Sequence, residues 1–157
     1  MKLTKLLLLT LITLIVTAGC SGAPDYSEVN SHIKAQGVQL GLEVNKVFEL
    51  LDDQPDEEMC VYGYEYFFEN SGLNIGFRLD QNTVRRVTVR NTHDSIYTIQ
   101  VGDKIETVSQ TLEDFGYAAD ETTQGRFVKD DLYFTPVSKD GQTIDQLIIE
   151  VINDDII

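Results

Sequence analysis

The sequence predicts an α+β domain of two tandem repeats, each a short helix followed by about three antiparallel strands, with the helices packed on one face of the sheet. Three observations predict it. Two pairs of segments match at nearly the same offset, apolar residues recur at helical spacing near the start of each repeat, and segments of alternating polarity follow. Short turns between those segments favour antiparallel pairing.

The repeat is visible when residues 38–51 are aligned with residues 99–112, which gives four identities and three conservative apolar matches at an offset of 61 residues. Residues 80–89 align with residues 140–149 at an offset of 60. Two matches at nearly one spacing indicate an internal repeat within one compact domain. The expected limits are residues 37–92 for repeat 1 and residues 93–157 for repeat 2.

Each repeat begins with a short helix. Three apolar residues stand at i, i+3 and i+7, a stripe that packs a helix of roughly three turns on a sheet. The stripes are Val44, Val47 and Leu51 in repeat 1, and Ile105, Val108 and Leu112 in repeat 2. Pro55 and Gly116 follow the stripes and mark the ends of the two helices.

Segments of alternating apolar and polar residues follow each helix and predict strands. They are residues 62–68, 73–79 and 84–90 in repeat 1, and residues 125–129, 132–137 and 143–152 in repeat 2. Pro136 has no amide hydrogen, so it indicates an edge strand or an irregularity in the second of these strands in repeat 2.

Residues 1–19 read as an export signal peptide that is not part of the fold. Lys2 and Lys5 give it a basic start, residues 6–16 are mostly apolar, and small residues precede Cys20. The apolar run is too short for a stable membrane span, which needs about 20 apolar residues. The run Thr-Ala-Gly-Cys that ends at Cys20 resembles the lipobox of bacterial lipoproteins, although the first lipobox position is most often Leu.

The lipobox resemblance implies a diacylglyceryl group on the Cys20 thiol, cleavage before Cys20, and often acylation of the new amine, for instance by palmitate. It places the protein in the cell envelope, on the outer membrane facing the periplasm if the cell has two membranes, or on the outer face of the cell membrane if it has one. Residues 20–36 are expected to hold the lipidated cysteine, a tether and a helical lead-in from Val29 to Ala35. The alternative is an ordinary secretory signal cut after Ala18.

The chain is acidic, with 12 Lys and Arg against 26 Asp and Glu and a formal net charge of −14. Loss of Lys2 and Lys5 with the signal peptide removes two positive charges and leaves −16. This charge disfavours nucleic acid as a partner, because phosphates are repelled. With Cys20 lipidated, Cys60 has no cysteine left for an intramolecular disulfide.

The order of a helix and then three antiparallel strands, twice over, resembles the α+β modules of BamE-type envelope lipoproteins and of the β-lactamase-inhibitor protein. The resemblance covers residues 38–152 and rests on Gly41 and Gly102, on the helix spacing of both repeats, and on Thr83 and Thr143 at the strand starts. It implies protein–protein contact without catalysis. Inhibition of β-lactamase is not implied, because that inhibitor is secreted without a lipid.

Residues that carry catalysis or bind metals form no recognised pattern. His32 and His93 stand in no motif and are expected to be exposed loop residues. Residues 52–58 contain five carboxylates, which form either a calcium site on a flexible loop or, as we favour, a solvated acidic turn. We therefore predict no catalytic residue, no metal and no cofactor.

Two sets of side chains are candidates for partner binding. They are Arg78, Arg86 and Arg90, which lie opposite the apolar face of their strands, and Tyr62, Tyr64 and Tyr66, which share one strand face. The arginines either meet an anionic partner or pair with Glu65 and neighbouring acids across the strands. The tyrosines form either a recognition surface or, as we favour, the layer under the helix.

These observations predict a membrane-anchored, non-catalytic interaction or assembly module whose partner is another envelope protein. The alternative is a ligand-binding or enzyme-inhibiting lipoprotein that uses an open face of the sheet. A metal-dependent or hydrolytic enzyme is the third hypothesis, and the lack of a catalytic motif counts against it.

Overall fold

A computed structural model describes residues 25–60, 63–78 and 81–152, so the signal peptide and Cys20 lie outside the described residues. The helices are α1 (Ser27–His32), α2 (Val44–Leu50), the 3-10 turn η1 (Ile105–Thr107) and α3 (Val108–Asp114). The strands of the first half are β1 (Ile33–Lys34), β2 (Asp56–Cys60), β3 (Gly63–Phe68), β4 (Leu73–Arg78) and β5 (Val84–Val89). Those of the second half are β6 (Ser95–Ile96), β7 (Ile99–Gln100), β8 (Ala118–Ala119), β9 (Phe127–Lys129), β10 (Leu132–Val137) and β11 (Gln146–Val151). Among the described residues, no helix has the length and apolar character needed to cross a membrane.

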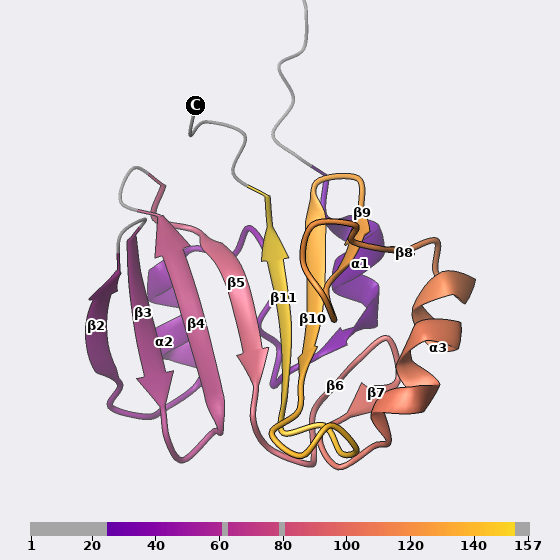
Figure 1. The fold of residues 1–157 in the computed structure, drawn as a ribbon. Coiled ribbons are helices and arrows are strands. Elements are labelled where there is room, and N and C mark those ends of the chain that lie inside the picture. The colour runs from indigo at the N-terminus through magenta and orange to yellow at the C-terminus, as the bar shows by residue number, and fades with distance from the viewer. Residues whose placement is uncertain (1–24, 61–62, 79–80, 153–157) are drawn as a thin grey trace, which may run out of the picture.

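Eight antiparallel strands form one sheet in the order β2-β3-β4-β5-β11-β10-β9-β8 (Figure 1). The four strands of the first half are consecutive up to β5, and the four of the second half follow in reverse from β11. The β5–β11 pair therefore joins the two halves, with Thr88 opposite Ile148. A smaller sheet has the order β1-β6-β7.

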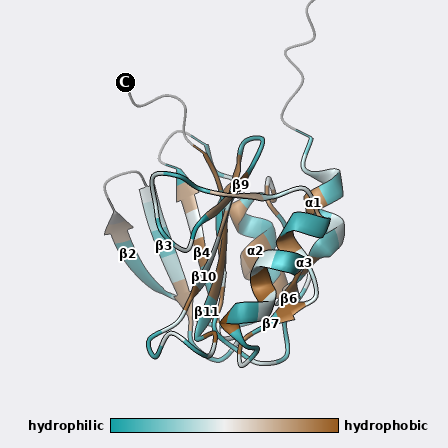
Figure 2. Ribbon diagram, turned by 45° about the vertical axis from the view of Figure 1, so that its right-hand side comes forward, coloured by the Kyte–Doolittle hydropathy of each residue, from teal (hydrophilic) through white to brown (hydrophobic). Residues whose placement is uncertain are grey.

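The helices α1, α2 and α3 lie on one side of the large sheet, and the core fills the space between (Figure 2). Ile75, Val87 and Ile149 on the central strands are fully buried, as are Val47 and Leu112 on the helices. Because strand side chains alternate between the two faces of a sheet, the row of paired residues Ile75, Val87 and Ile149 marks the face that meets the helices. The predicted α+β class is confirmed.

The two helices α2 and α3 are preceded by the same backbone arrangement. The amide of Gly41 donates to the carbonyl of Val84 at 2.9 Å, and the amide of Gly102 donates to the carbonyl of Ile144 at 2.9 Å. The φ angles of these glycines are 81° and 98°, in the left-handed region that favours glycine. Each bond links the segment before a helix to a strand region: Val84 is the first residue of β5, and Ile144 lies two residues before β11.

The predicted strands agree best with β3, β4, β5 and β10, where alternation is regular. The strand β11 begins later than expected, at Gln146, because Thr143 pairs instead with Lys104 in a separate bridge. Pro136 lies in the half of β10 that extends beyond β9, which pairs only with residues 132–134. That half of β10 has a neighbouring strand on one side, which accommodates a residue without an amide hydrogen.

The prediction of a solvated acidic turn at residues 52–58 was wrong in part. Asp56–Cys60 forms β2 at the edge of the large sheet, so each half contributes four strands to it rather than three. An edge strand pairs on one side only, and its charged side chains stay in water. The sequence of β2 therefore shows little of the alternation of apolar and polar residues that predicts a strand.

The lead-in before repeat 1 was predicted as a helix through Ala35, but α1 ends at His32. The next two residues form β1, in which Ile33 pairs with Ile96 of β6. Val29 and Ile33 are 4% and 5% exposed and Ala35 is fully buried. This segment is therefore part of the folded domain, packed beside the second half, rather than part of a tether.

A two-residue turn, Tyr97-Thr98, joins β6 to β7 with φ angles of 53° and 67°. Left-handed backbone costs a non-glycine residue about 1–2 kcal/mol. Burial of the Tyr97 ring, which is 1% exposed, offsets that strain. The ring centroid lies 5.0 Å from that of His32, which also lies 4.8 Å from that of Phe115. The expectation that His32 is an exposed loop residue was therefore wrong, whereas His93 is exposed.

Candidate interaction surface

The side of the large sheet that faces away from the helices is called the open face below. Its residues occupy alternate strand positions, and register places them in rows that cross the sheet. They include Glu65 and Phe67 of β3, Asn74 and Arg78 of β4, Arg86 and Thr88 of β5, Ile148 and Glu150 of β11, and Tyr133 and Thr135 of β10. A mixture of aromatic, aliphatic and arginine side chains is typical of protein–protein interfaces.

Arg86 lies at the centre of the open face. Its Nε and Nη2 donate to Oε2 of Glu150 at 2.8 and 2.5 Å, and its Nη1 lies 3.9 Å from Oε2 of Glu65. The Arg86 side chain is 40% exposed and that of Glu150 is 24% exposed. This geometry fits the cross-strand pairing weighed from the sequence, and the Arg86 side chain stays partly exposed on this face.

Arg90 and Arg78 lie farther from the centre of the same face. Nη2 of Arg90 donates to Oε1 of Glu69 at 3.0 Å. Arg78 is the last residue of β4 and stands opposite Gly63. The structure thus brings the three predicted arginines to one face, interleaved with carboxylates.

Arg85 departs from this face because the β4–β5 pairing is irregular. Gly76 pairs with Arg86 but Phe77 pairs with Val84, so Arg85 is the extra residue of a β-bulge. Its guanidinium donates to the Tyr26 hydroxyl at 3.4 Å and to the carbonyl of Ile152 at 3.5 Å. Arg85 therefore links the two ends of the described domain.

Tyr64 and Tyr66 lie on the helix side of the sheet and not on the open face. The Tyr66 ring centroid lies 5.1 Å from that of Phe48 on α2 and 5.6 Å from that of Phe77 on β4. Both tyrosines are partly buried against the core. This geometry fits the layer under the helix, and Tyr62 lies outside the described residues.

Asn74 is a residue of the open face that the sequence did not single out. It stands between Phe67 and Thr88 in the register and is 7% exposed. Its amide oxygen is buried and accepts no hydrogen bond from the described part of the chain. An unsatisfied buried acceptor costs about 1–3 kcal/mol. No sequence signal marks it, because its pattern is that of any outward polar residue in a strand.

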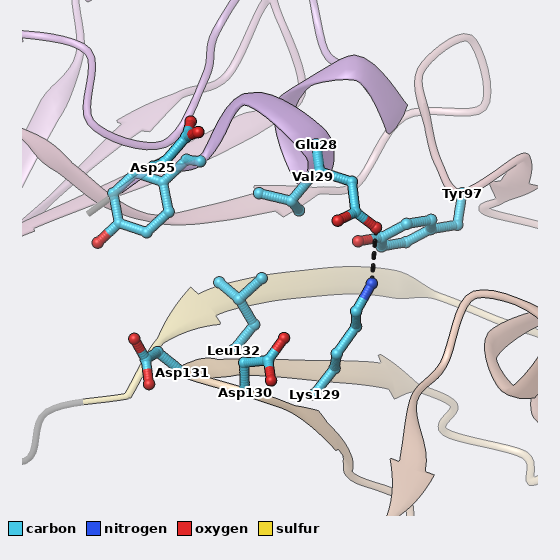
Figure 3. Close-up of a pocket in the computed structure, with 9 residues that line it drawn as sticks. Asp25, Glu28, Val29, Tyr97, Lys129, Asp130, Asp131 and Leu132 are labelled. Carbon is cyan, nitrogen blue, oxygen red and sulfur yellow. Dashed lines mark hydrogen bonds and ion pairs between the residues drawn. The ribbon is translucent and has the colours of Figure 1, made fainter.

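A cavity of about 160 Å³ lies between α1 and the turn that joins β9 to β10 (Figure 3). Tyr97 lies beside the Glu28–Lys129 contact in Figure 3, and the other lining residues are Asp25, Tyr26 and Val29 on one side and Asp130, Asp131 and Leu132 on the other. Nζ of Lys129 donates to Oε1 of Glu28 at 2.7 Å, and this hydrogen bond lowers the pKa of Glu28. Pockets that bury a drug-sized ligand occupy roughly 300–1,000 Å³, so this cavity holds a smaller molecule at most.

The hydroxyl oxygens of Tyr97 and Tyr117 lie 3.1 Å apart in the core of the second half. The residues are 1% and 3% exposed. Burial raises the pKa of both phenols, because an ionised phenol loses its hydration there. Both hydroxyls therefore stay protonated at neutral pH, and the pair supports packing rather than acid–base chemistry.

Within residues 25–60, 63–78 and 81–152, no three His, Cys, Asp or Glu side chains converge as metal ligands. The acidic residues of β2 are distributed along a strand instead of around a point. What the arrangement offers is a broad surface of mixed charge and apolar groups, which suits contact with another macromolecule. No family model, curated protein or solved structure matches the chain.

Proposed function

We propose that this protein is a non-catalytic lipoprotein of the cell envelope, anchored through Cys20, that binds another envelope protein through the open face. The observation that supports the open face as the contact surface is Asn74, whose buried amide oxygen accepts no hydrogen bond from the described residues and which lies on a face that no described helix covers. Unsatisfied buried polar groups are rare in folded proteins, and because the Asn74 oxygen is itself buried, a partner's donor reaches it only when the side chain turns outward on the open face.

The proposed anchor is close to the folded domain. Four residues separate Cys20 from Asp25, where the described domain begins, and a fully extended chain of this length spans at most about 18 Å. The end of the sheet where Arg85 meets Tyr26 and Ile152 is then the end nearest the membrane. The open face stands beside the anchor and stays accessible to a protein in the same envelope layer.

We also propose that the domain is a duplicated module of the BamE type. Matched hydrogen bonds at Gly41 and Gly102 support this, because they occur at the offset of the aligned segments. The β5–β11 register supports it too. Val87, which aligns with Leu147, pairs with Ile149, and Val89, which aligns with Ile149, pairs with Leu147. The pairing is therefore symmetric about the Thr88–Ile148 pair. Self-complementary contact of this kind is what two copies of one module make.

The ligand-binding alternative is favoured by two hollows beside α1, the cavity at the β9–β10 turn and a second of about 610 Å³ against Gln39 and Leu40. The first has only about 160 Å³ and is crossed by the Glu28–Lys129 ion pair, and the second is wide open to solvent, so neither encloses a substrate-sized molecule. We therefore rank it below protein binding.

Two experiments test the proposal. Cys20→Ala and globomycin treatment are expected to block maturation, and normal processing without lipid incorporation would contradict the anchor. Photo-crosslinking from Tyr133 on the open face is expected to capture an envelope protein that the same probe at Gln110, exposed on α3, does not capture. Equal capture from both positions, or capture from Gln110 alone, argues against the open face.

A further inference from the structure

The edge strand β2 differs from the opposite edge of the large sheet. The opposite edge, β8, is only two residues long, which is a common protection against unwanted pairing. The strand β2 has five residues and pairs with β3 alone among the described strands. An antiparallel strand directs alternate backbone groups to each side, and β2 lies at the edge of the sheet (Figure 1), so its outer amides and carbonyls pair with no other described strand.

The two faces of β2 carry different chemistry. Met59 and Glu57 stand opposite Tyr64 and Tyr66, which lie on the helix side, whereas Asp56 and Glu58 stand opposite Phe67 and Glu65 on the open face. A strand added beside β2 would meet one exposed apolar side chain and one carboxylate on the helix side, and two carboxylates on the open face.

Exposed apolar side chains lie on and near β2. Among the described residues, Met59 of β2 is 75% exposed and Phe48 of α2 is 36% exposed, whereas Leu50 of α2, at 47%, lies against Gly37. Phe48 packs edge-on against Tyr66, and Tyr66 lies beside Tyr64. An apolar shelf thus runs from the core out to the edge strand, where water-exposed apolar area favours a partner.

The charge of β2 selects among partners. Pairing of β2 with a second copy would bring two sets of Asp56, Glu57 and Glu58 together, in a chain whose net charge is already −14. Like charges opposite one another destabilise a strand pair, so self-association is disfavoured. A strand that carries Lys or Arg is favoured by the same carboxylates.

We propose that β2 binds an extended segment of a partner protein in which apolar residues alternate with Lys or Arg, added as a strand to the edge of the large sheet. The apolar side chains of that segment lie beside Met59, and its basic side chains lie beside Asp56 and Glu58. Backbone hydrogen bonds supply affinity and the two faces of β2 supply selectivity, as in other cases of strand addition. This surface is separate from the centre of the open face, so the inference does not depend on Arg86 or Asn74.

The test uses the full chain in detergent and a short fluorescent peptide in which valine alternates with lysine. Binding is expected to weaken with salt. Peptides with glutamate in place of lysine, or with methylated backbone nitrogens on one edge, are expected not to bind. Hydrogen exchange of the β2 amides is expected to slow on binding of the parent peptide.

Matched variants separate strand addition from general attraction to an acidic protein. Glu58→Lys is expected to weaken binding at least about tenfold, whereas Glu106→Lys, the same charge change on exposed η1, leaves it nearly unchanged. Equal effects of the two variants, undiminished binding of the methylated peptide, or no binding of the parent peptide would each overturn the proposal.

Discussion

Arg86 of β5 and Glu150 of β11 share a charge-assisted contact in which both Nε and Nη2 of the arginine reach one carboxylate oxygen. The contact crosses the strand pair that joins the two halves of the sheet. It is half-buried, so it combines cross-strand stabilisation with partial access to solvent.

Glu150→Gln is expected to lower the free energy of unfolding by about 0.5–1 kcal/mol, because the neutral amide keeps the shape of the side chain and loses the ion pair. Urea denaturation at low and high salt measures it, and the difference should shrink as salt rises. Glu49→Gln is the matched control, since the Lys46–Glu49 pair is more than half exposed and is expected to contribute nothing measurable. An equal loss in both variants would contradict a special role for the contact.

The Tyr97–Tyr117 pair makes a prediction about alkaline pH. Burial raises the pKa of both phenols above the unfolded value of about 10, so the folded protein holds these protons more tightly. Stability is therefore fully present below pH 10 or so and falls as the pH rises beyond it. Tyr117→Phe is expected to cost about 1 kcal/mol at pH 8 through the lost hydrogen bond, and to flatten the alkaline decline.

Urea unfolding at a series of pH values checks this prediction. Tyr133→Phe on the open face is the control and is expected to keep the wild-type alkaline decline. If Tyr117→Phe declines as steeply as the wild type, the buried pair is not the source of the pH dependence.

The glycines before α2 and α3 test whether the two halves use the same backbone device. Gly102→Ala is expected to cost about 1–2 kcal/mol from the left-handed backbone alone, because an added Cβ meets nothing within 4 Å. Gly41→Ala is expected to cost more, since its Cβ would stand 3.2 Å from the Tyr26 ring. Thermal unfolding measures both, and Gly102→Asn should be milder than Gly102→Ala because Asn tolerates this backbone. A neutral Gly102→Ala would contradict the argument.

The regular parts of the fold were predictable because each of those elements buries one face, so its apolar residues recur at a single period. The residues of β4, for example, alternate between faces, since Ile75 and Phe77 enter the core on the helix side and Asn74 and Arg78 lie on the open face. The stripe of Val44 and Val47 predicted α2 for the same reason. Local periodicity sufficed wherever an element has one buried face.

The elements that were missed depend on contacts between distant residues. The lead-in was predicted as a helix through Ala35, but after His32 the chain forms β1, because Ile33 pairs with the distant Ile96 of β6. The β6–β7 hairpin was not predicted because Tyr97 and Thr98 occupy a turn that usually takes Asn or Gly. At the candidate site, the arginine face followed from alternation, whereas the burial of Asn74 depends on its neighbours across three strands.

Substitution of Asn74 is expected to change the free energy of unfolding and partner binding in opposite directions. Asn74→Leu replaces an amide of similar size by an apolar side chain, so it removes a buried oxygen that accepts no hydrogen bond from the described residues. Since that oxygen costs about 1–3 kcal/mol, the variant is expected to raise the free energy of unfolding of the isolated protein by up to about that amount. The same variant is expected to reduce photo-crosslinking from Tyr133, because a partner loses the acceptor that its donor would meet.

Thr135→Val, on the same open face, is the matched control and should leave crosslinking largely intact. A stabilised Asn74→Leu protein that still crosslinks fully would remove Asn74 from the contact, and a destabilised one would mean that its amide contributes to the fold. A gain in stability together with a loss of crosslinking is the pattern expected of a residue kept polar for a partner.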